Sequence, residues 1–74
     1  MDHLTSTNYK NYLIRAFERE SARWRAEFRK ADGREIIIIA DGTRHNSITT
    51  SADALTADAA IELAKWAIDG GGIK

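Results

Sequence analysis

The strongest pattern in the sequence is a strict alternation of charged and apolar residues over positions 23–29. The apolar members are Trp24, Ala26 and Phe28, and each is flanked by charged residues. In an extended chain, successive side chains point to opposite faces, so these three fall on one face. The pattern predicts a β-strand with one buried face and one exposed face.

Residues 12–19 also alternate and are predicted to form the preceding strand of an antiparallel pair, joined by a short loop. Pairing residue i with residue 42 − i puts Ile14 opposite Phe28 on the inner face and Arg15 opposite Glu27 on the outer face. The same rule pairs Ala16 with Ala26 and Phe17 with Arg25. A slip of one residue would set an arginine against a phenylalanine, so this register is preferred.

A third strand is predicted at residues 35–40, which include four consecutive isoleucines. Asp32-Gly33 precedes it, and such a pair favours a two-residue hairpin turn that needs positive φ. The expected pairs are Phe28 with Ile37, Ala26 with Ile39 and Lys30 with Glu35. Asp41-Gly42 repeats the turn signal, and residues 44–50 would return as a fourth strand that covers the edge.

A helix is predicted from Thr56 to Asp69. Thr56 is a favoured N-cap, Asp58 in the first turn complements the helix dipole, and Gly70 ends the helix. The helix is expected to pack on the sheet through Ala60, Leu63, Ala64 and Ala67. Trp66 lies at one edge of the apolar arc, where it would either cap the core or anchor an interface.

Together these elements predict an α+β fold, a three- or four-stranded antiparallel meander followed by one C-terminal helix packed on one face. Residues 1–74 form a single domain, with 1–8 and 70–74 expected as flexible tails. Residues 9–31 also fit one long helix with five large apolar residues near one face. The period of two at residues 23–29 favours strands over that alternative.

Two segments carry a resemblance to known proteins. Arg23-Trp24-Arg25-Ala26 followed by Asp32-Gly33, together with residues 59–69 near the end, resembles small uncharacterised bacterial proteins of a sheet-then-helix type. The layout of residues 12–69 is also similar to the strand-strand-strand-helix half of HicB-type antitoxin domains. The resemblance supports strands over the long helix, and it implies no activity and no functional residue.

The isoleucine run places large apolar side chains on both faces of the predicted sheet. Ile37 and Ile39 are assigned to the inner face, with Tyr12, Ile14, Ala16, Trp24, Ala26 and Phe28. One helix cannot cover two faces, so the apolar residues of the other face are expected to lie against a partner or under another segment of the same chain. The candidate interface residues are Leu13, Phe17, Ile36, Ile38 and Trp66. The expected partner is a second copy of the chain or a small protein.

The composition of the chain also favours association with a partner. The chain has 74 residues, and twelve of its apolar residues are alanine. So small a core is marginal alone, and dimerisation is a common remedy. Without cysteine, neither a disulfide nor a thiolate metal site can form.

Charge gives a second hypothesis, a nucleic-acid-binding regulator. Net charge is zero, but residues 15–34 carry seven basic against four acidic side chains. Arg15, Arg25 and Arg29 share the outer strand face and are the candidate nucleic-acid contacts. Glu27 within that face and the zero net charge favour an ordinary solvated surface instead.

No catalytic, metal or cofactor constellation is predicted, so the chain is expected not to be an enzyme. His3 and His45 are the two histidines, and a metal site wants three or four converging ligands. His45 with Ser47 or Thr49 lacks an orienting carboxylate. The sequence has neither a signal peptide nor an apolar run long enough for a membrane span, so a cytoplasmic location is expected.

Overall fold

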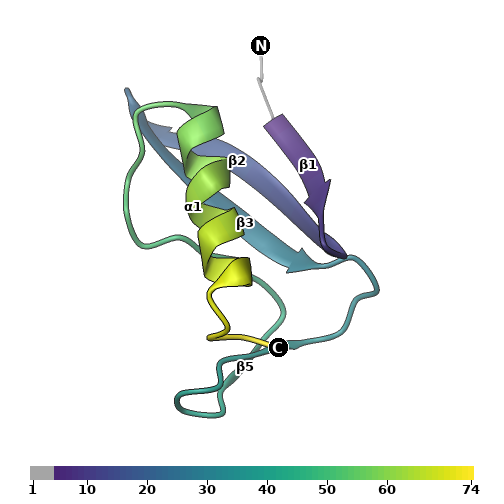
Figure 1. Cartoon of the computed structure of the whole chain (residues 1–74). Helices are drawn as coiled ribbons and strands as arrows, with labels where there is room; N and C mark the ends of the chain where they lie inside the picture. The colour runs from purple at the N-terminus through teal and green to yellow at the C-terminus, as the bar shows by residue number, and fades with distance from the viewer. Residues whose placement is uncertain (1–4) are drawn as a thin grey trace.

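A computed structural model describes residues 5–74, which fold into an antiparallel sheet with one helix across one face (Figure 1). The elements in chain order are β1 (Thr5–Tyr9), β2 (Tyr12–Glu20), β3 (Arg23–Lys30), β4 (Ile36–Ile37), β5 (Arg44–His45), β6 (Ile48–Thr49) and α1 (Ala57–Asp69). The main sheet has the order β1-β2-β3-β6, and β4 pairs with β5 in a separate two-stranded sheet. The α+β class and the C-terminal helix are therefore as predicted.

The β2–β3 pair has the predicted register. Ile14 lies opposite Phe28 and Arg15 opposite Glu27, and the rule holds until a bulge between Glu18 and Glu20. The alternation of apolar and charged residues favours this register, because a slip of one residue would move apolar side chains to the solvent side. The strands of the 9–31 region exclude the single long helix.

The segment predicted as an N-terminal tail instead contains a strand. β1 pairs with β2 through a tight turn in which Lys10 and Asn11 both have positive φ, of 48° and 67°. A two-residue turn of this handedness matches the twist of the flanking strands. Residues 1–4 of the predicted tail lie outside the described residues.

The predicted pairing of the isoleucine segment with β3 is wrong. The edge of β3 is taken by later residues: Thr50 N–H donates to the Ala26 carbonyl at 2.8 Å, and Trp24 and Ala54 exchange two backbone hydrogen bonds. Ile48 lies opposite Phe28. Had the four isoleucines stayed in the main sheet, two of them would have faced solvent. The chain instead leaves the main sheet after β3. The predicted fourth strand is divided between β5 and β6.

The C-terminal segment predicted as a flexible tail pairs with the isoleucine segment. Ile37 and Lys74 exchange backbone hydrogen bonds of 2.9 and 3.0 Å, and Ile39 N–H donates to the Gly72 carbonyl at 3.0 Å. The C-terminus lies beside the chain that follows β3 (Figure 1). These bonds satisfy backbone groups that β5 leaves free, because β5 covers the opposite side of this segment.

The core lies between α1 and the inner face of the sheet. Thr56 caps the helix as predicted, accepting a hydrogen bond from Ala59 N–H at 3.1 Å. From the helix, Ala60 and Ala64 are buried as predicted, whereas Ile61 is buried in place of Ala67. Within residues 5–74, the buried apolar side chains are Ile14, Ala16, Ala26, Phe28, Ile36, Ala54, Ala60, Ile61 and Ala64.

Candidate functional site

The five predicted interface residues lie in four different environments. Ile36 is fully buried in the core, so of the two alternatives predicted for it the chain itself, and not a partner, covers it. Ile38 is half-buried and forms an isolated bridge with Ile73, directly after β4. Leu13 and Phe17 share the outer face of the main sheet, and Trp66 lies on α1.

Trp66 is 70% exposed and lies nearly opposite the buried stripe of α1. The buried positions are Ala60, Ile61 and Ala64, and a helix advances 100° per residue, so position 66 falls on the far side. Trp66 therefore does not cap the core. Its exposure favours the second of the two roles predicted for it, an interface anchor.

A groove runs along α1 on the side of the loop that precedes the helix, with a volume of about 510 Å³. We call it the α1 groove and define its apolar walls as Ala54, Leu55, Ala59, Leu63 and Trp66. Leu55 is 78% exposed, the highest value among the exposed large apolar residues of positions 5–74. A smaller hollow lined by Ala52, Leu63 and Ala67 continues the groove.

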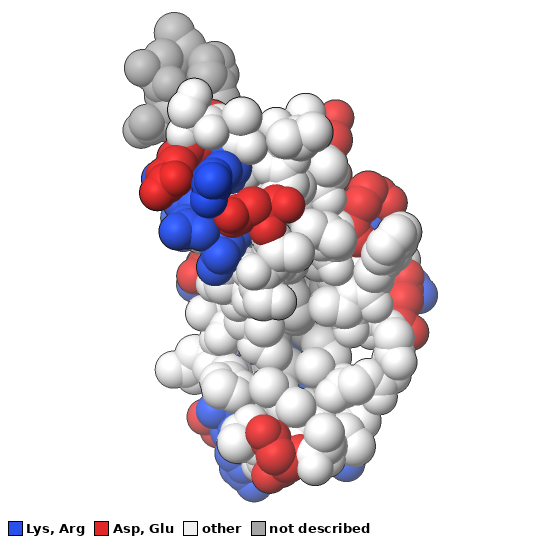
Figure 2. All heavy atoms as spheres, turned by 90° about the vertical axis from the view of Figure 1, so that its left-hand side faces the viewer, with Lys and Arg blue, Asp and Glu red and all other residues white. Residues whose placement is uncertain are grey.

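Two carboxylates at the rim of the groove are both ion-paired. Asp53 accepts a 2.8 Å hydrogen bond from Arg25 Nε, and Arg19 and Arg23 approach the same carboxylate at 3.3 and 3.8 Å. The bond from Arg25, followed by that from Arg19, lowers the pKa of Asp53. Glu62 pairs with Lys65 at 3.4 Å. The face seen in Figure 2 has a cluster of basic and acidic side chains, coloured blue and red, near its upper end. A broad surface of uncharged residues, coloured white, lies below this cluster.

The opposite flank of α1 carries a second cluster of polar contacts. Tyr9 donates to Asp69 at 2.5 Å and Lys10 at 2.6 Å, while the Lys65 ammonium lies 5.2 Å from the Tyr9 ring centre. The bonds from Lys10 and then Tyr9 lower the pKa of Asp69. These contacts hold the β1–β2 turn against the end of the helix.

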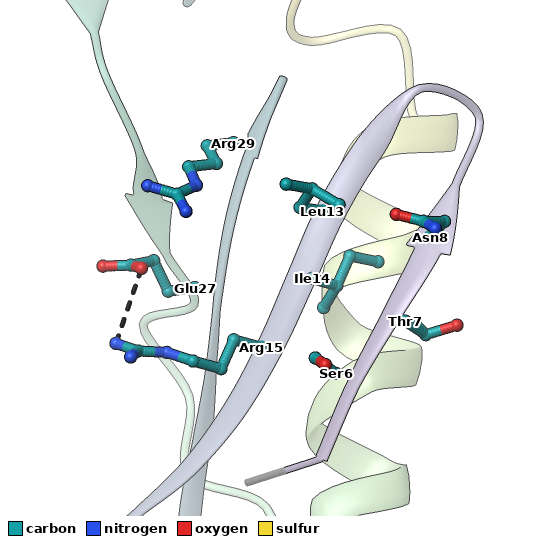
Figure 3. A pocket seen from close by; sticks show the side chains of 8 residues that line it. All are labelled: Ser6, Thr7, Asn8, Leu13, Ile14, Arg15, Glu27 and Arg29. Carbon is teal, nitrogen blue, oxygen red and sulfur yellow. Dashed lines mark ion pairs between the residues drawn. The ribbon is translucent and has the colours of Figure 1, made fainter. Parts of the chain in front are cut away.

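The three arginines that were predicted to contact nucleic acid lie on the outer face of the sheet, and they differ in their ion pairing. Arg25 is hydrogen-bonded to the carboxylate of Asp53. Arg15 pairs loosely with Glu27 at 3.6 Å, and Arg29 makes no ion pair within residues 5–74. Figure 3 shows Glu27 between the Arg15 and Arg29 side chains. They line a pocket of about 630 Å³ together with Ser6, Asn8 and Leu13.

His45 is exposed, and its Nε2 lies 3.0 Å from the Thr43 hydroxyl. Within residues 5–74, no three histidine, aspartate or glutamate side chains gather as metal ligands, and His3 lies outside that range. No helix in the described part of the chain has the length and apolar character that crossing a membrane requires.

Leu55 was missed by the sequence reasoning. It directly precedes the N-cap Thr56, a position whose apolar residue commonly packs back on the fourth helical residue, here Ala60. That pattern predicts a buried leucine, so its 78% exposure could be seen only in the structure. The likeness to HicB-type antitoxin domains stays a prediction. Comparisons with protein-family models, with curated proteins and with solved structures found no match for this chain.

Proposed function

We propose that this chain is a small non-enzymatic protein-interaction module that binds another polypeptide through the α1 groove. The observation that carries the proposal is the pair of large apolar side chains on its walls, Trp66 at 70% and Leu55 at 78% exposure. Contact of such surface with water is unfavourable, and covering it contributes about 25 cal/mol per Å². A tryptophan offers about 150–250 Å², so these two residues supply several kcal/mol toward binding.

The directions of the carboxylate pKa shifts support a role without catalysis. Catalytic acids and bases usually have pKa values shifted toward neutrality. The pKa values of Asp41, Asp53 and Asp69 are instead lowered, in each case by hydrogen bonds to the carboxylate. Carboxylates held in this way are ionised at neutral pH and stabilise the fold.

A peptide-display selection against the folded chain tests the proposal and does not require an identified partner. Selected peptides should lose affinity by about tenfold or more on Trp66→Glu, because removing a central tryptophan commonly costs about 2 kcal/mol or more. Ile39→Glu is the matched control, since Ile39 is also exposed, at 53%, but lies outside the groove. Peptides that bind equally well to the Trp66→Glu and Leu55→Glu variants would contradict the proposal.

Nucleic-acid binding at the outer sheet face is the second candidate function. It is favoured by Arg29, which has no carboxylate partner in the described chain, and by the loose 3.6 Å pair of Arg15. Arg25 is a poor test residue, because its replacement would also release Asp53. Arg29→Glu is the sharper variant. Arg34→Glu is its control, because Arg34 is exposed beyond the end of β3.

A gel shift with a labelled single-stranded oligonucleotide decides this second candidate. Binding should weaken steeply with salt, because phosphate contacts release counterions. It should be reduced by Arg29→Glu and kept by Arg34→Glu. Absence of binding at about 50 mM salt, where such contacts are strong, would exclude it.

A further inference from the structure

We propose that an extended segment of another polypeptide adds to the sheet as a further strand beside β1 and places a large apolar side chain on Leu13. This surface is separate from the α1 groove and goes beyond the function proposed above. The sheet order is β1-β2-β3-β6, so β1 is an outermost strand (Figure 1). The outermost strand on the other side, β6, has two residues against the five of β1.

The backbone groups of Ser6 and Asn8 point away from the sheet. Tyr9 and Tyr12 lie opposite each other at the two ends of the β1–β2 turn, and the hydrogen bond of such a turn joins these two positions. Along an antiparallel pair, hydrogen-bonded and non-hydrogen-bonded residues alternate. Thr7 is therefore bonded to β2, whereas Ser6 and Asn8 direct their N–H and C=O groups outward. We call these outward groups the β1 edge.

The opposite side of the sheet shows what usually happens to such groups. The outward backbone groups of Trp24 and Ala26 in β3 are hydrogen-bonded to residues 50–54. Those of the β1 edge have no backbone partner within the described positions 5–74. An extended polypeptide presents N–H and C=O groups at the same spacing, so it is the natural partner for a free edge.

β1 also lacks the features with which soluble proteins commonly protect an edge, namely charged residues, proline and bulges. The strand reads Thr-Ser-Thr-Asn-Tyr, and its register with β2 is continuous from Thr5 to Tyr9. Its five residues are close to the usual length of a strand. The edge is therefore long enough and open enough to pair with another strand.

The outer-face pocket, of about 630 Å³, lies beside this edge and can hold a large side chain. Ser6 and Asn8 line it from β1, and Leu13 lines it from β2, directly opposite Asn8 (Figure 3). Leu13 is 38% exposed. Because no large apolar side chain of β1 covers it, a large apolar side chain from an added strand can cross β1 and bury Leu13. Such a pocket gives specificity to a strand that binds through its backbone.

The side chains of β1 argue against a second copy as the occupant. In an antiparallel pair of two β1 strands, the bonded residues lie opposite each other with their side chains on the same face. A second β1 would therefore place its own Ser6 and Asn8 on the outer face. Neither side chain is large and apolar, so Leu13 would stay exposed. The occupant is instead a strand of different sequence, with a large apolar residue on that face.

A labelled synthetic peptide of about seven residues, in which threonine alternates with tyrosine, is the probe. Fluorescence anisotropy measures its affinity for the folded chain. Methylating the backbone nitrogens of the tyrosines should weaken binding by about tenfold or more, because hydrogen bonds to the edge are lost. Replacing the tyrosines by alanine should also weaken it, because Leu13 is then left uncovered.

Variants of the chain test the same contact from the other side. Ser6→Pro removes one outward N–H, and proline is tolerated on an edge strand at such a position. It should weaken binding by about tenfold, whereas Ser6→Ala keeps the N–H and should bind like wild type. In hydrogen exchange followed by NMR, the bound peptide should protect the amides of Ser6 and Asn8 and change that of Thr7 little. Circular dichroism confirms that each variant remains folded.

Several outcomes would overturn the inference. One is the absence of binding, and another is binding that survives both N-methylation and Ser6→Pro. Loss of binding on Trp66→Glu but not on Ser6→Pro would place the peptide in the α1 groove, which supports the proposed function and excludes the β1 edge. A wild-type dimer in light scattering that Ser6→Pro converts to a monomer would make a second copy the occupant. Binding that depends on Ser6 and not on Trp66 supports the β1 edge whether or not the α1 groove binds a peptide.

Discussion

At the scale of single residues, the isoleucine run shows how burial differs between chemically identical neighbours. Ile36 is fully buried, Ile37 and Ile38 are half-buried, and Ile39 is 53% exposed. The backbone hydrogen bonds of this segment alternate between Lys74, Thr43 and Gly72 as acceptors. The backbone of this segment therefore lies between two other stretches of the chain, and one of its side chains, Ile36, is fully buried in the core.

Ile36→Ala should lower the free energy of unfolding by about 2–5 kcal/mol, because it leaves a cavity in a packed core. Ile39→Ala should change it by about 0.5 kcal/mol or less, since surface substitutions usually have small effects. Urea denaturation at one fixed protein concentration measures both values. Equal losses in the two variants would contradict the assignment of Ile36 as the anchor.

Asp53 should make the fold sensitive to acid. The Arg25 hydrogen bond, then that of Arg19, lowers the pKa of Asp53 in the folded chain. The stabilisation is therefore present above the unfolded value of about 3.9 and is lost as pH falls through the lower folded value. The free energy of unfolding of Asp53→Asn should fall less steeply than that of wild type between about pH 5 and pH 2.

Arg25→Gln provides the control for the Asp53 prediction. It removes the principal donor to the same carboxylate, so it should flatten the pH dependence in the same region. Because the two residues form one interaction, the double variant should add little to either single variant. Additive effects across this pH range would show that the two groups act independently.

At the scale of elements, the β2–β3 turn contains a residue in an unfavourable conformation. Ala22 has a φ of 59°, in the left-handed region that costs residues with a side chain about 1–2 kcal/mol. Ala22→Gly should therefore raise the melting temperature, with a gain of about 0.5–1 kcal/mol. Ala31→Gly is the control at an exposed position without positive φ. It should be destabilising.

The elements that could be predicted are those with a strong local pattern. Alternation set the β2–β3 register, and the N-cap with its apolar periodicity set the helix. β1 could not be predicted, because Thr5–Tyr9 has almost no apolar residue and hence no alternation. The destination of β4 could not be predicted either, since four identical side chains favour no register. Asp32-Gly33 does form a turn, with Gly33 at a φ of 81°, but the chain leaves the sheet after it.

The candidate site was only partly accessible from the sequence. Trp66 was identified as a candidate because helical periodicity placed it away from the centre of the apolar arc. The wall formed by Leu55 depends on how residues 50–55 return along the edge of β3, and long-range pairing of that kind leaves no local signal. The basic face was found, but the capture of Arg25 by Asp53 also depends on that return.

At the scale of the whole molecule, the C-terminal residues 72–74 hold the isoleucine segment to the rest of the structure through backbone hydrogen bonds. Deleting residues 72–74 should remove the bonds that protect the amide protons of Ile37 and Ile39. The Ile38 amide, which donates to Thr43 at 2.9 Å, should keep more of its protection. Hydrogen exchange followed by NMR distinguishes these three neighbouring amides, and uniform loss of protection would indicate general unfolding of the segment.

The order of strands has a consequence for how fast and in what sequence the chain folds. β1, β2 and β3 are neighbours in sequence and are joined by turns of two residues each, so their contacts are local and close rapidly. The pairing of residues 72–74 with 37–39 spans about half the chain and should come late. Substitutions in the two turns should therefore act chiefly on the refolding rate, which Ala22→Gly should raise, whereas substitutions at Ile73 should chiefly accelerate unfolding. Stopped-flow measurements on Ala22 and Ile73 variants would separate these two effects as high and low φ-values.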